Sequence, residues 1–227
     1  MRSTAIIIMH LTAISFCSTL SCQENPDTVY GLDPVLYNGT LYASYLPGNV
    51  NGHPYLFSSG FEPGYVIIKG RKFDNVLLNY DIFNQKLLLK YQDLNGSGRI
   101  ILLSQAWMNV FSLQDKQFEY IDAGTGQKKL FQVIGNDTLK ILYSWKKELS
   151  LSNQAGNTGY YFSDPVKTMY LYGNNGLYRF RNNRNFIDFF YPEIKSKIAI
   201  YLRENRINVR KASDRNMLLL INNCNEI

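Results

Sequence analysis

The chain has 227 residues, of which 45% are hydrophobic and 14% aromatic, and its formal net charge is +6. This length and composition allow a self-sufficient core in one domain or two small ones, which excludes a disordered protein. His10, Cys17 and Cys22 lie in or beside an N-terminal segment with the pattern of a removable leader, which leaves only His53 and Cys224 in the body. A zinc site needs three or four such ligands, so the sequence excludes one within a single chain. It also shows no calcium-binding loop and no phosphate-binding loop, so no metal and no cofactor are predicted.

Residues 1–21 have the three-part layout of a secretory signal peptide. A basic start at Arg2 is followed by the apolar stretch Ala5–Phe16 and then by small residues before Cys22. The apolar stretch is too short for a stable membrane span, which needs about 20 residues. A buried N-terminal helix is the alternative interpretation.

Cys22 is the candidate lipidation site, because the segment before it resembles a bacterial lipobox. The usual pattern has Leu three positions before the Cys, whereas Thr19 stands there and Leu20 follows it. With ordinary cleavage, a soluble exported protein would instead carry Cys22 and Cys224, which could pair. Cys224 falls on an apolar stripe with helical spacing, which is typical of an inert buried thiol and favours lipidation over the disulfide.

The next segment, residues 22–52, is expected to form a tether and N-terminal extension, with a hairpin turn at Asn38–Gly39. Residues 53–182 are predicted to form an antiparallel β body, because turn residues separate successive apolar runs. Runs such as residues 87–89 are apolar on both faces, which favours a sandwich or barrel-like body, whereas residues 139–146 alternate between one buried and one mostly wet face. The expected strands cover residues 65–69, 73–80, 86–91, 99–103, 109–113, 117–121, 139–146, 160–162, 168–172 and 177–181.

Residues 183–227 are predicted to form a helical lobe of two helices, packed on the β body. A helical turn is expected at residues 185–190, and Pro192 fits the first turn of a helix that runs to about residue 205. Ser213 or Asp214 can cap a second helix that runs to about residue 223. The whole chain is therefore expected to be mainly β, with a C-terminal helical lobe.

The positive charge is concentrated toward the C-terminus. Residues 166–215 hold 11 basic and 4 acidic residues, whereas residues 22–165 are nearly neutral. An anionic membrane surface, an acidic glycan or an acidic partner protein would fit such a region, and so would a plain solvated helix face. Nucleic acid is disfavoured, because the chain shows no nucleic-acid-binding motif and has an export signal. The candidate basic contact surface comprises Arg179, Arg181, Lys195, Lys197, Arg203, Arg206, Arg210 and Lys211.

No catalytic constellation stands out in the sequence. His53 lies alone in a turn sequence, which is typical of a surface residue rather than a general base. Asp74, Asp81 and Asp93 lie near predicted turns, where Asp commonly makes local hydrogen bonds. A carboxylate-based hydrolase is therefore the second alternative, and no catalytic residue is assigned.

Aromatic side chains offer a different alternative, a glycan-binding module. Exposed aromatic rings can stack on sugars, although packing in the core or in an interface is the favoured role for most of them. Thr28 and Thr138 are candidate O-glycosylation sites, since each lies in an Asp-Thr-aliphatic triplet that resembles a sequon of exported Bacteroidota proteins. The aromatic candidates are Trp107, Trp145, Tyr160 and Tyr161.

Several segments between about residues 60 and 225 share a recognisable pattern. They are residues 64–73, 76–81, 110–113 with Phe118, 159–162, 194–206 and the last amphipathic stretch. In these segments the chain resembles β-rich envelope proteins and lipoproteins of Bacteroidota, a group that brings no assigned reaction or catalytic residue. The sequence thus predicts a lipid-anchored outer-membrane protein, a non-enzymatic binding or accessory subunit of an envelope protein complex. An outer-membrane β-barrel complex is one candidate partner, and a soluble periplasmic or secreted protein is the alternative.

Overall fold

The computed structural model describes residues 32–122, 126–154, 157–174 and 176–227. All of these belong to one compact unit, Leu32–Ile227. The predicted signal peptide and the candidate residues Cys22 and Thr28 lie outside the described residues. The helices that are described are all too short or too polar to cross a membrane.

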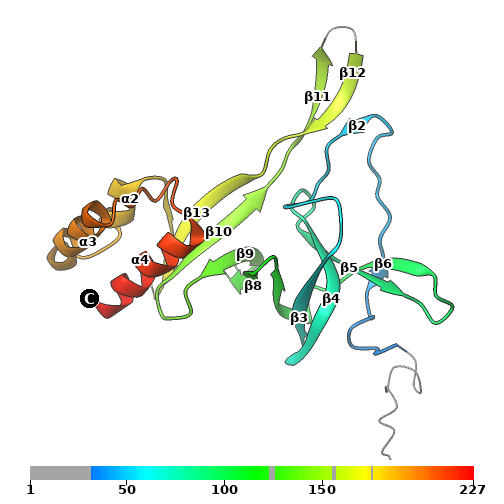
Figure 1. The fold of residues 1–227 in the computed structure, drawn as a ribbon, viewed down its shortest axis with the longest axis horizontal. Helices are drawn as coiled ribbons and strands as arrows, with labels where there is room; N and C mark the ends of the chain where they lie inside the picture. Colours follow the sequence, from blue (N-terminus) through cyan, green and yellow to red (C-terminus); the bar gives the residue numbers. More distant parts are fainter. Residues whose placement is uncertain (1–31, 123–125, 155–156, 175) are drawn as a thin grey trace, which may run out of the picture. The chain divides into compact units, whose positions relative to one another are not determined.

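The prediction of a mainly antiparallel β fold followed by C-terminal helices is confirmed. Eleven strands form one antiparallel sheet in the order β1-β6-β5-β4-β3-β7-β8-β9-β10-β13-β14, so β1 and β14 are its edges (Figure 1). Most strands lie beside their neighbours in sequence, because short turns join them. The strands are β1 (Thr40–Leu41), β3 (Glu62–Ile68), β4 (Arg71–Asp81), β5 (Lys86–Gln92), β6 (Gly98–Leu102), β7 (Met108–Leu113), β8 (Lys116–Asp122), β9 (Lys128–Ile134), β10 (Lys140–Lys146), β13 (Val166–Gly173) and β14 (Gly176–Phe180).

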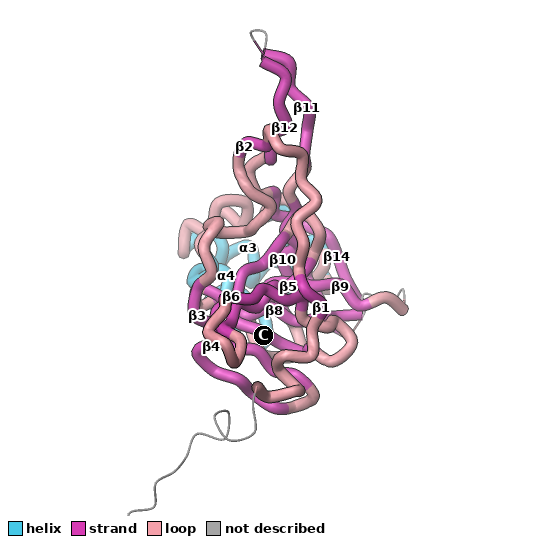
Figure 2. Tube along the Cα trace, turned by 90° about the vertical axis from the view of Figure 1, so that its right-hand side faces the viewer, coloured by secondary structure: helices cyan, strands magenta, loops and turns pink. Residues whose placement is uncertain are grey.

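A second, smaller sheet contains β11 (Leu149–Gln154), β12 (Asn157–Phe162) and β2 (Val50–Asn51), with β12 in the middle and β2 parallel to it. β11 and β12 prolong the hairpin of β10 and β13, and the amide of Glu148 donates to Ser163 Oγ (3.0 Å) where the two parts meet. Figures 1 and 2 both show this prolongation extending away from the main sheet. Residues 149–162 are termed the hairpin arm below.

The core of the main sheet lies on both of its faces. One cluster is built on β3 to β8, where Phe111 and Phe118 stack with ring centroids 4.7 Å apart. On β10, Tyr143 packs toward the helices, while the fully buried Leu142 points to the other face and joins Phe131. The prediction that this face of β10 is mostly exposed to water is therefore wrong at Leu142, because side chains of the neighbouring strands cover Leu142.

Three helices follow the last strand, of which the first corresponds to the predicted helical turn. They are α2 (Asn183–Asp188), α3 (Pro192–Glu204) and α4 (Asp214–Glu226). Pro192 occupies the first turn of α3, and Ser213 caps α4 by accepting from the amide of Asn216 (3.3 Å), as the sequence predicted. The apolar faces of α3 and α4 join one core cluster with α2 and with side chains of β10, β13 and β14 such as Phe180.

One turn prediction is wrong, and the sequence missed the strands β2, β9 and β11. Asn38–Gly39 does not form a hairpin turn, because residues 40–41 pair with β6 instead. Gly39 lies so close to β6 that an added Cβ would collide with the carbonyl oxygen of Leu102. β9 and β11 were not expected. β9 begins with two lysines and β11 contains Ser and Asn residues, and these residue types are uncommon in strands.

Candidate functional site

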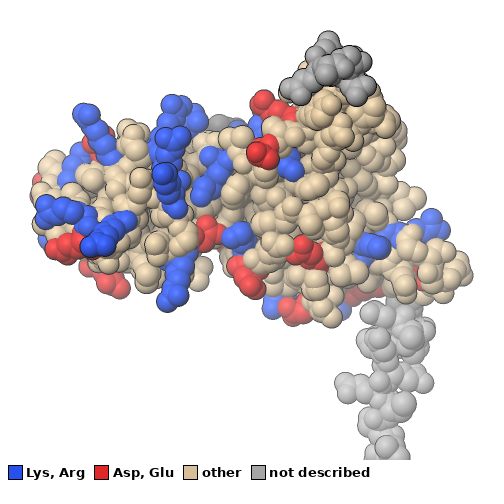
Figure 3. Space-filling view, turned by 45° about the horizontal axis from the view of Figure 1, so that its top comes forward, with Lys and Arg blue, Asp and Glu red and all other residues tan. Residues whose placement is uncertain are grey.

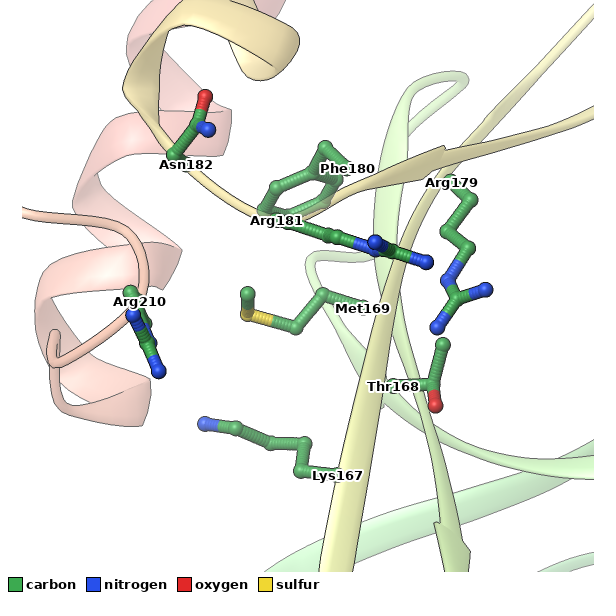
Figure 4. Close-up of a pocket in the computed structure, with 8 residues that line it drawn as sticks. All are labelled: Lys167, Thr168, Met169, Arg179, Phe180, Arg181, Asn182 and Arg210. Atoms are coloured by element: carbon green, nitrogen blue, oxygen red, sulfur yellow. The ribbon is translucent and has the colours of Figure 1, made fainter.

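A pocket of about 590 Å³ lies at the edge of the main sheet, where β14 ends. The last residue pair in the β13–β14 ladder is Met169 with Phe180, so Lys167 and Thr168 of β13 continue past the end of β14. After Phe180 the chain leaves the sheet and enters α2. The early end of this short edge strand therefore leaves part of β13 open to the pocket. The pocket is lined by Lys167, Thr168, Met169, Arg179, Phe180, Arg181, Asn182 and Arg210 (Figure 4).

Four cationic side chains line this basic pocket: Lys167, Arg179, Arg181 and Arg210. Lys167 and Arg210 lie on one side of β13 and Arg179 lies on the other (Figure 4). They come from β13, from β14 and its end, and from the linker between α3 and α4. In Figure 4 the ammonium group of Lys167 points toward Arg210. Within the described ranges, no Asp or Glu carboxylate lies within 4.0 Å of the charged nitrogens of these four side chains. The pocket therefore carries positive charge that no ion pair of the described chain offsets.

Lys167 is held in place by aromatic residues. Its Nζ lies 4.2 Å from the ring centroid of Tyr143 and 5.9 Å from that of Trp145. Burial lowers the pKa of Lys167, while the nearby Asp214 carboxylate acts in the opposite direction. Asp214 is already paired with Lys116 at 2.6 Å. The ammonium group of Lys167 is thus half-buried against rings and has no carboxylate of its own.

The predicted basic contact surface divides into two parts. Arg179, Arg181 and Arg210 lie together in the basic pocket, whereas the other five side chains lie outside its lining. Figure 3 shows Lys and Arg gathered over one part of the molecule and mixed with Asp and Glu elsewhere. Sequence reasoning missed Lys167, because only the β13–β14 register shows that it lies beside the arginines. The five residues outside are Lys195, Lys197, Arg203, Arg206 and Lys211.

The aromatic candidates have different surroundings. Trp107 is only partly buried, but the ammonium group of Lys69 lies 3.8 Å from its ring centroid and occupies that face. Trp145 packs between two core clusters, as expected, and also lines a second cavity of about 350 Å³. Tyr161 on the hairpin arm is 37% exposed, and Tyr160 is half-buried. Trp107 also lines a cavity of about 440 Å³, so Trp107, Trp145 and Tyr161 all have an accessible surface or cavity.

The candidate carboxylates each bind a local partner. Asp74 pairs with Lys72 on the surface at 2.7 Å. Asp93 accepts from Arg99 Nε at 2.9 Å and from backbone amides of its own turn. Asp81 is buried and accepts from the amides that follow it at 2.8 and 3.0 Å. These contacts agree with the local hydrogen-bonding role that the sequence suggested.

The described histidine and cysteine lie in different environments. The ring of His53 stacks on Tyr55 with centroids 5.8 Å apart, and burial lowers the pKa of His53. Cys224 is buried in α4, and burial raises the pKa of its thiol to about 12. Among the described residues there is no group of three or more His, Cys, Asp or Glu side chains that could hold a metal ion. Thr138, the remaining candidate for O-glycosylation, is exposed in the turn before β10.

The hairpin arm is the second feature with the character of a binding surface. Its sequence, residues 149–162, contains no charged residue and no proline. β11 pairs with β12 on one side and is an edge of the small sheet on the other. Leu151 is 55% exposed, and Val166 at the base of the arm is 57% exposed. Among the described residues no further strand pairs with β11, so the arm combines an open strand edge with exposed apolar side chains.

Comparisons with models of known protein families, with curated proteins and with solved structures found no match to this chain. The interpretation of function therefore depends on the basic pocket, the hairpin arm and the sequence patterns described above.

Proposed function

We propose that the protein is a lipid-anchored, non-enzymatic accessory subunit of a cell-envelope complex, and that it docks on its partner through the hairpin arm. The tether is Cys22, and the membrane is the outer membrane. The observation that carries the docking proposal is the unprotected edge of β11 with Leu151 exposed on it.

An exposed strand edge is a template for pairing with another chain. Natural proteins usually block such edges with lysine, proline or a covering loop, because unpaired N–H and C=O groups attract a further strand. β11 carries none of these charged or proline residues. An extended segment of a partner protein can add to this edge through main-chain hydrogen bonds, with Leu151 as an apolar contact.

The size of the edge favours a partner protein over a second copy of the chain. A strand of six residues is about 20 Å long, and self-pairing along it covers much less than the roughly 1,200 Å² of a stable interface. A partner that adds a strand and also contacts neighbouring surfaces reaches that area. The occupant of β11 is therefore an extended segment of a different protein.

Purification from envelopes in mild detergent tests the docking. The wild-type protein should bring down a stoichiometric partner, and Leu151→Lys should lose it, because a charge on the edge opposes strand addition. Leu94→Lys is the matched control, since Leu94 is 74% exposed in a turn far from β11 in sequence. Equal recovery with both variants, or a monomeric or homodimeric wild-type protein in light scattering, contradicts the proposal.

Labelling with a palmitate analogue tests the tether independently. The label should be attached through Cys22 and should be absent from Cys22→Ala. An unlabelled protein that fractionates as a soluble periplasmic product rules out the lipid anchor while leaving the docking test unaffected.

A glycan-binding module is a second candidate, favoured by the cavity of about 350 Å³ beside Trp145. Phe83 and Tyr120 also line this cavity, together with the amides of Gln85 and Gln105. Aromatic rings with a few polar groups are a suitable lining for a sugar. A glycan array should show binding that Gln105→Ala weakens, whereas an array without binding contradicts this second candidate.

A further inference from the structure

The basic pocket gathers like charges at one place in the fold. Lys167, Arg179, Arg181 and Arg210 all line it, and like charges in proximity repel each other. The carboxylate that acts on Lys167 most directly, Asp214, is already shared with Lys116. An anion bound among the four cations relieves this repulsion, so the pocket has the electrostatic character of an anion site.

The positions of the pocket residues are held by packing and hydrogen bonds. Lys167 lies over the ring of Tyr143. The linker that carries Arg210 is attached to α2, because Asn183 donates to the carbonyl of Ile207 (2.7 Å) and accepts from the amide of Val209 (2.9 Å). Two of the four cations are thus positioned before any ligand arrives, which reduces the entropic cost of binding.

The chemistry of the donors favours phosphate. Each guanidinium group presents paired N–H donors that match two oxygens of a phosphate or carboxylate, and one such group is enough for a carboxylate. Cationic groups on more than one side of the pocket suit an anion whose oxygens point in several directions. The hydroxyl of Thr168 is a further donor in the lining. The volume of about 590 Å³ leaves room for part of the molecule that carries the phosphate.

We propose that the basic pocket binds a phosphate group, carried either by a membrane lipid headgroup or by a soluble phosphate ester. This site is separate from the hairpin arm and does not depend on the docking proposed there. Phosphate binding fits a pocket lined by cations from β13, β14 and the α3–α4 linker, whereas a solvated basic face does not require that the cations share a pocket.

Calorimetric titration with inorganic phosphate at low salt tests the site. The wild-type protein should bind, and the double variant Arg181→Gln/Arg210→Gln should bind at least ten times more weakly. The matched control is Lys197→Gln/Arg203→Gln, which removes the same charge from α3 outside the pocket and should change affinity less than twofold. Both variants alter exposed side chains, and unchanged thermal unfolding shows that they remain folded.

The result that overturns the proposal is an equal loss in the two double variants, which means diffuse attraction to the whole basic region. Absence of phosphate binding by the wild-type protein overturns it as well. Leu151→Lys should bind phosphate normally, so a failure of the pocket and a failure of the arm give different results.

Two further titrations distinguish the source of the phosphate. Vesicles of phosphatidylcholine with added phosphatidylglycerol represent the lipid headgroup, and glucose 1-phosphate represents a soluble ester. Vesicle binding that the pocket variant loses and the control retains assigns a lipid ligand. Binding of the sugar phosphate alone, with the same dependence on the pocket, assigns a soluble ligand. If the pocket variant and its control behave alike with both probes, the pocket is not a phosphate site.

Discussion

The packing of α3 holds the linker that carries Arg210 of the basic pocket, and one pair of isoleucines tests this packing. Ile198 of α3 is fully buried in the core cluster that the helices share with the sheet, whereas Ile200 on the same helix is 44% exposed. The substitutions Ile198→Ala and Ile200→Ala remove the same atoms from opposite environments. Both substitutions change helix propensity by the same amount. A difference in unfolding free energy between the two variants therefore measures how the buried face of the helix packs.

The expected magnitude follows from the buried atoms. The carbon atoms that Ile198→Ala removes contribute about 0.8 kcal/mol each, or about 2.4 kcal/mol together. The cavity that remains increases the loss of unfolding free energy to about 3 kcal/mol. For a domain of this size, this lowers the melting temperature by about 6–12 °C. Ile200→Ala should change the unfolding free energy by less than about 0.5 kcal/mol, because its side chain is largely solvated.

Urea and thermal unfolding, followed by circular dichroism, measure both variants. Phosphate affinity should also decrease in Ile198→Ala, because Arg210 is positioned by the linker that follows α3, although no pocket cation has been removed. Similar stabilities for the two variants would refute the reasoning, since α3 would then not be anchored through its buried face.

Three further predictions concern individual positions. An added Cβ at Gly64 collides with the carbonyl oxygen of Ser112, so Gly64→Ala should destabilise by about 1–3 kcal/mol in urea unfolding, whereas Gly98→Ala, with open space around it, should not. Burial raises the pKa of Tyr120 to about 12, so the folded protein keeps a proton that the unfolded chain loses above pH 10. Stability should fall between pH 10 and 12 by about 2–3 kcal/mol from this group, and Tyr120→Phe should remove that part of the fall. Cys224 should resist alkylation at pH 8 until the protein unfolds, as measured by peptide mass spectrometry; rapid native labelling would contradict its burial.

The strands and helices differed in how well the sequence predicted them. The helices at Pro192 and Ser213 were predicted closely, because capping and apolar spacing act within a few residues. β9 was missed, because Lys128 and Lys129 at its start are not typical strand residues and shorten the apolar run that follows. The turn expected at Asn38–Gly39 does not form, because residues 40–41 pair with β6, which lies far along the chain.

The candidate site was predicted only in part. The excess of basic residues near the C-terminus identified Arg179, Arg181 and Arg210, but equally five cations that lie outside the pocket. Lys167 was not among the candidates, because its position beside the arginines depends on the register that ends at Phe180. The exposed edge of β11 also depends on sheet order, which pairs distant segments.

The sequence by itself determined the mainly β composition, the helix starts and the concentration of positive charge, since these depend on propensity, capping and composition within short segments. Only the tertiary structure decided which cations line one pocket, where β14 ends and which strand remains an edge. The physical reason is that strand order and register come from non-local hydrogen bonds and packing, and a shift of one residue would turn Lys167 to the other face of the sheet, away from Tyr143.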